Sequence, residues 1–94
     1  MSENQPESSV RQSDHDVLRE LADAGNETAL DGLADLAHAR GDVQELNELL
    51  DEGCGRAGAH LADRAVAERN LIELQRLADE GVEQAEDALQ QLLR

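Results

Sequence analysis

The spacing of three glycines is the feature that most limits what this chain can fold into. Gly25, Gly53 and Gly81 are each 28 residues apart. A fixed period of this length is typical of stacked helical units, each of which buries its apolar face against a neighbour. Besides the glycines, five other positions carry the same residue in all three units: Leu18/Leu46/Leu74, Leu21/Leu49/Leu77, Asp23/Asp51/Asp79, Ala29/Ala57/Ala85 and Leu33/Leu61/Leu89.

Each unit has the pattern of two short helices. The first helix is expected to begin after Asp14, Asp42 or Asn70, which are all good N-cap residues. Its leucines recur at helical spacing, and it should end at the shared glycine, which readily adopts the left-handed backbone after a helix. A second apolar stripe then predicts the second helix. Gly41 should end that helix in the first unit, whereas Arg69, at the same place in the second unit, is a weaker stop signal.

The predicted fold is therefore all-α, an α-solenoid-like array of three 28-residue helix pairs. Helices are expected near 15–24, 27–40, 43–52, 55–68, 71–80 and 83–94, in units 15–42, 43–70 and 71–94. Residues 1–14 are polar and lack periodicity, so we expect a disordered N-terminal tail there. Helices this short are marginal alone, and their stability should come from stacking.

The unit Leu-x-x-Leu-x-Asp-x-Gly-x-x-x-Ala-x-x-x-Leu resembles tetratricopeptide-type and HEAT-type α-solenoids. The stretch Leu33–Asp42 is more similar to short helix-pair repeat proteins of high-G+C bacteria. The resemblance covers residues 15–94 and implies a scaffold that binds other proteins. It carries over no catalytic residue.

Charge excludes several classes of partner. The net charge is −14, every basic residue is Arg or His, and there are no aromatic residues. Nucleic acids require a basic footprint, and unpaired bases usually require aromatic platforms, so neither nucleic acid nor an anionic membrane is an expected partner. No apolar run approaches a membrane span, the first residues contain no apolar signal core, and a single Cys allows no internal disulfide. A cytoplasmic protein without a cofactor is expected.

The recurring Asp23, Asp51 and Asp79 are the most distinctive polar set. A carboxylate near a helix C-terminus opposes the helix dipole and needs a reason. The interpretation we favour is that each carboxylate accepts hydrogen bonds from the amides that open the next helix. The functional alternative is a ladder of three carboxylates that binds a basic peptide.

Other chemistry-bearing residues favour structural roles. Gly53, Gly55 and Gly58 match GxGxxG, but a helical stretch precedes them instead of the strand that a dinucleotide site requires. Arg40-Gly41-Asp42 is explained by a helix end followed by an N-cap. Cys54 is the one strong nucleophile, and catalysis would require His38 or His60 beside its sulfur. His15, His38 and His60 occupy three different repeat positions, so no histidine ladder or closed metal-ligand set is expected.

The expected function is a non-enzymatic interaction scaffold that binds a basic protein or peptide segment. The alternative is an acidic decoy that mimics nucleic acid and inhibits a DNA-binding protein. Leu89, Leu92 and Leu93 in the last helix form an apolar surplus, for which a weak symmetric homodimer is the simplest use.

Overall fold

Six helices make up the part of the chain that the structure describes. The computed structural model covers residues 7–94, and the surroundings of side chains are defined from residue 14 onward. No strand occurs within this range, so the predicted all-α class is confirmed. The helices are α1 (Glu7–Asp23), α2 (Glu27–Ala39), α3 (Val43–Asp51), α4 (Gly55–Ala67), α5 (Leu71–Asp79) and α6 (Glu83–Leu92).

Helix α1 is longer at its N-terminal end than the sequence pattern predicted. It begins at Glu7, so Asp14 lies inside the helix and is not an N-cap. The physical reason is that residues 7–14 contain neither Gly nor Pro, and an existing helix extends easily through polar residues that do not break it. A disordered tail was expected over residues 1–14, but residues 7–14 belong to α1 in the structure. Residues 1–6 lie outside the described part of the chain.

Capping side chains fix where three of the helices begin. The side chains of Asn26, Asp42 and Asn70 each accept a hydrogen bond from the backbone N–H three residues later, over 3.0 to 3.1 Å. Each of these bonds satisfies one of the amides that a helix start leaves without a partner. The predicted caps at Asp42 and Asn70 are thus confirmed.

Left-handed residues end the helices. Gly25, Gly53 and Gly81 have φ angles of +98°, +96° and +93°, which glycine adopts without steric cost. Arg69 takes a φ of +53° at the position where the preceding unit has Gly41. Helix α4 therefore stops before Arg69 even without a glycine, at the expense of an unfavourable backbone conformation.

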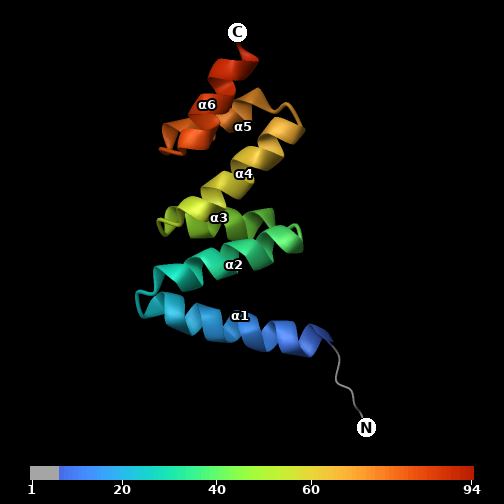
Figure 1. Ribbon diagram of the computed structural model, residues 1–94, viewed down its shortest axis with the longest axis vertical. Coiled ribbons are helices and arrows are strands. Elements are labelled where there is room, and N and C mark those ends of the chain that lie inside the picture. Colours follow the sequence, from blue (N-terminus) through green and yellow to red (C-terminus); the bar gives the residue numbers. More distant parts are fainter. Residues whose placement is uncertain (1–6) are drawn as a thin grey trace.

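The helices form two rows along an elongated molecule. Each helix packs against its neighbours in the chain, and α4 also contacts both α2 and α6. Helices α2, α4 and α6 therefore form one row, and α1, α3 and α5 pack beside it. Helices α1 and α6 lie at opposite ends of the molecule (Figure 1). The extents are 58 × 27 × 16 Å, and the radius of gyration of 15.5 Å exceeds the value of about 12 Å for a compact domain of this length.

Leucine and alanine form the core. The largest fully buried side chains are Leu33, Leu46, Leu49, Leu74 and Leu77, and alanines fill much of the remainder. Burial falls off toward the first helix, because Leu21 is 43% exposed although its equivalents Leu49 and Leu77 are fully buried. At this repeat position the leucine is therefore fully covered only in the second and third units, where another helix pair precedes it.

Candidate functional site

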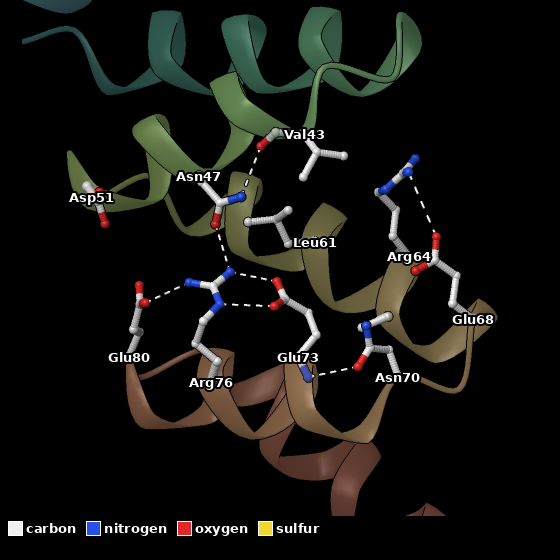
Figure 2. Close-up of a pocket in the computed structure, with 11 residues that line it drawn as sticks. Val43, Asn47, Asp51, Leu61, Arg64, Glu68, Asn70, Glu73, Arg76 and Glu80 are labelled. Atoms are coloured by element: carbon white, nitrogen blue, oxygen red, sulfur yellow. Dashed lines mark hydrogen bonds and ion pairs between the residues drawn. The ribbon is translucent and has the colours of Figure 1, made fainter.

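A concave groove lined by charged side chains lies between α3 and α5. It has a volume of about 560 Å³ and α4 forms its floor (Figure 2). Leu61 and Ala65 supply apolar floor positions, while most of the walls are polar. The charged lining consists of four carboxylates, Asp51, Glu68, Glu73 and Glu80, and two guanidinium groups, Arg64 and Arg76.

Arg76 is the centre of the polar network in this groove. Its Nη2 donates to Glu73 Oε2 over 2.6 Å, and its Nη1 donates to Glu80 Oε2 over 2.8 Å. Nη2 also donates to Asn47 Oδ1 on α3 over 2.7 Å, so the guanidinium connects the two walls (Figure 2). The hydrogen bonds from Arg76 lower the pKa of Glu73 below its ordinary value, because they stabilise the carboxylate.

Side chains from α1 and α3 interact in a comparable way one unit earlier. Arg19 on α1 donates to Glu52 over 2.7 Å and to Asp23 over 3.0 Å. His15 on the same helix lies 3.1 Å from a carboxylate oxygen of Glu45 on α3. In both places an arginine connects the two units: Arg19 reaches Glu52 of the later unit, and Arg76 reaches Asn47 of the earlier one.

The three recurring aspartates are not brought into one network. Asp23 accepts from Arg19, and Asp79 accepts from Gln75 over 3.0 Å; both partners lie one turn earlier in the same helix. Asp51 lines the groove between α3 and α5. The capping interpretation is wrong, because Asn26 caps α2, while α4 and α6 have no side-chain hydrogen bond at their N-caps.

The sequence interpretation missed a second recurring set of carboxylates. Glu45 and Glu52 are the equivalents of Glu73 and Glu80, and all four accept from arginine side chains. The signal was available as an identity between the second and third units. This identity is a weaker signal than those shared by all three units, because the first unit has Val17 and Ala24 at these positions.

Two histidines that occupy different repeat positions meet between α2 and α4. The rings of His38 and His60 are stacked with centroids 4.1 Å apart. His60 Nε2 lies 2.8 Å from Asp35 Oδ1, which also accepts from Arg56 over 3.0 Å. The Arg56 guanidinium, followed by His60, holds the pKa of Asp35 below its ordinary value.

Cys54 lies at the start of α4 with its sulfur turned toward α2. The residue is 3% exposed, and its Sγ lies 3.6 Å from the Leu30 carbonyl oxygen and 3.8 Å from Asp31 Oδ1. Burial raises the pKa of the thiol, which disfavours the nucleophilic thiolate. The motif Gly53–Gly58 follows helix α3, as its structural interpretation requires.

The leucines of the last helix differ in exposure. Leu89 and Leu92 are partly buried against the core, whereas Leu93 is 68% exposed. At the equivalent position the earlier units have Ala37 and Ala65, which are buried. Leu93 is therefore an apolar projection at the α6 end of the molecule.

Comparisons with known proteins add no assignment: no protein-family model, curated protein or solved structure matches the chain. Within residues 7–94, no three side chains of His, Cys, Asp or Glu are grouped so that they can hold a metal ion. No helix in this range has both the length and the apolar character required to cross a membrane.

Proposed function

We propose that this chain is a non-enzymatic scaffold of the α-solenoid type that binds a basic protein or peptide segment. The observation that carries the proposal is the acidic groove between α3 and α5, in which four carboxylates outnumber two arginines above an apolar floor. Such a surface suits a segment that combines Arg or Lys with small apolar residues.

The repeat architecture supports a scaffold role. The left-handed glycines recur every 28 residues, and each helix contacts only elements close to it in the chain. Solenoids of this kind present extended faces to partners, and short helix-pair repeat proteins of high-G+C bacteria are the family that the sequence resembles.

Within the groove, Asp51 and Glu68 are the carboxylates best placed to meet a new cation. Glu73 and Glu80 already hold Arg76, whereas Glu68 lies 3.9 Å from Arg64, at the outer limit of an ion pair. Such a long, exposed pair contributes little to stability, so exchanging it for a contact with a partner costs little.

The test is a binding titration with a fluorescein-labelled peptide of alternating Arg, Ala and Leu residues, followed by fluorescence anisotropy at low and moderate salt. The double variant Asp51→Asn/Glu68→Gln should weaken binding strongly and reduce its salt dependence. The matched control, Asp16→Asn/Glu86→Gln, removes the same charge from exposed positions that do not line the groove, and it should weaken binding only slightly.

An equal loss in both variants would contradict a groove-specific site. That outcome would favour the acidic decoy, in which the total charge matters more than any single groove. Tight binding to a DNA-binding protein that double-stranded DNA displaces would then be the decisive observation for the decoy.

A further inference from the structure

The junction between the first two units shows how the end of one helix fills a crease in the next unit. Arg40, just after α2, donates to Asp42 Oδ2 over 3.3 Å and to Glu45 on α3. His38, in the last turn of α2, stacks on His60 of α4. The crease formed by Asp42, α3 and α4 is thus occupied by the C-terminal end of α2.

The same crease is open in the first unit. Asp14, Val17 and Gly32 are the 28-residue equivalents of Asp42, Glu45 and His60. Together with Leu18 and Leu36 they line a hollow of about 350 Å³ between α1 and α2. Val17 is 55% exposed. Because valine replaces the glutamate and glycine replaces the histidine, this hollow is more apolar than its internal counterpart.

The opposite end of the molecule carries the matching projection. Leu93 and Arg94 are the equivalents of Ala37 and His38, the residues at the end of α2. Leu93 is 68% exposed, and Arg94 is exposed beside it. The α6 end therefore presents a leucine where the internal junction has an alanine, and a cation where that junction has a histidine.

We propose that the α6 end of one copy of this chain docks into the hollow between α1 and α2 of a second copy. Leu93 enters the apolar hollow beside Val17 and Leu36, and the long side chain of Arg94, at the repeat position of His38, extends toward the Asp14 carboxylate at the rim. The contact is head-to-tail, so it leaves one free hollow and one free α6 end, and further copies can add.

Two features make a second copy the fitting occupant. The hollow is the repeat equivalent of the crease that the end of α2 occupies inside the molecule, and the Asp14 carboxylate at its rim is complementary in charge to Arg94 at the opposite end. Gln90 replaces the buried Ala34 and Ala62 of the internal junctions, so the inner helices of two copies cannot approach as closely. The contact is therefore centred on the last turn of α6 and is weaker than the internal junctions.

Net charge opposes the association. Each copy carries −14, and repulsion between copies is screened by salt. The association should therefore strengthen with added salt, whereas binding of a basic peptide in the groove between α3 and α5 should weaken. This opposite dependence separates the inference from the proposed function, which concerns another surface.

The test is sedimentation velocity over a concentration series at low and high salt, with circular dichroism to verify that each variant is folded. The wild-type chain should show a sedimentation coefficient that rises with concentration, most clearly at high salt. Leu93→Asp and Val17→Asp should each abolish the rise. Val66→Asp, which replaces an exposed apolar residue of α4 in the middle unit, should leave it unchanged.

Mixing the two disruptive variants gives the sharpest result. Leu93→Asp retains an intact hollow and Val17→Asp retains an intact α6 end, so an equimolar mixture should form a 1:1 dimer that does not grow. A Val17→Asp variant that still dimerises would overturn the proposal in favour of a symmetric contact through α6.

A wild-type chain that remains monomeric at high salt, up to its solubility limit, would also overturn it. If deletion of residues 1–6 then induced association, the occupant of the hollow would be the chain's own first residues.

Discussion

Replacing the same repeat leucine in two units tests how the helix pairs bury one another. Leu49 is fully buried, whereas its equivalent Leu21 is 43% exposed. Leu49→Ala should lower the free energy of unfolding by about 3 kcal/mol, because it removes buried methyl groups and leaves a cavity. Leu21→Ala should cost about 1 kcal/mol, since just over half of the side chain leaves water on folding and no closed cavity forms.

Thermal unfolding followed by far-ultraviolet circular dichroism measures this difference. The chain has no Trp or Tyr, so intrinsic fluorescence cannot report on unfolding. The Tm should fall by roughly 15 °C for Leu49→Ala and by roughly 5 °C for Leu21→Ala. The protein must be dilute, so that association between copies does not cover Leu21. Equal losses in the two variants would refute the reasoning, because they would show that Leu21 is as well covered in solution as Leu49.

Three further perturbations follow from individual contacts. A Cβ added at Gly58 would lie 2.9 Å from Val82 Cγ2, so Gly58→Ala should lower the Tm. Adding Val82→Ala to this variant should recover part of the lost Tm. A double variant whose Tm falls by the sum of the two single losses would contradict the contact. Arg76 lowers the pKa of Glu73, so the ion pair stabilises the fold above the ordinary pKa of 4.5, and this stabilisation is lost as the pH falls through the lowered value. In denaturant titrations at a series of pH values, Glu73→Gln should therefore reduce the loss of unfolding free energy at acidic pH. Burial raises the pKa of Cys54, so a thiol-specific disulfide reagent should react slowly with the native protein and rapidly in denaturant; fast native labelling would contradict the burial of this thiol.

Local sequence signals predicted the helices well because each signal acts within a few residues. Asp42 and Asn70 cap the helices that they were expected to cap, and the periodic glycines take the left-handed conformation. The start of α1 was missed for the same reason: residues 7–14 carry no pattern and no breaker, and such a stretch leaves the boundary open.

The candidate site was harder to predict, because the sequence repeat shows which positions are equivalent but not which positions of neighbouring units are in contact. The contacts between units join positions that are not equivalent. On this ground His15, His38 and His60 were expected to form no ladder, yet the structure stacks the rings of His38 and His60 between α2 and α4. Arg76 reaches Asn47 in the same way, from α5 to α3. The aspartates at helix ends are identical in all three units, while the glutamates of the pairs Glu45/Glu73 and Glu52/Glu80 are identical in two units only.

The order in which helices touch has a consequence for how fast the chain folds. No helix contact described in residues 7–94 joins elements more than two apart along the chain. Closing such short loops costs little conformational entropy, so folding should be limited by helix formation and local docking, on a timescale of about microseconds to milliseconds. Because the helix contacts are local in sequence, folding does not depend on one contact between distant parts of the chain. Any adjacent pair of helices can nucleate folding, and opening of the native state should start from the two ends of the molecule.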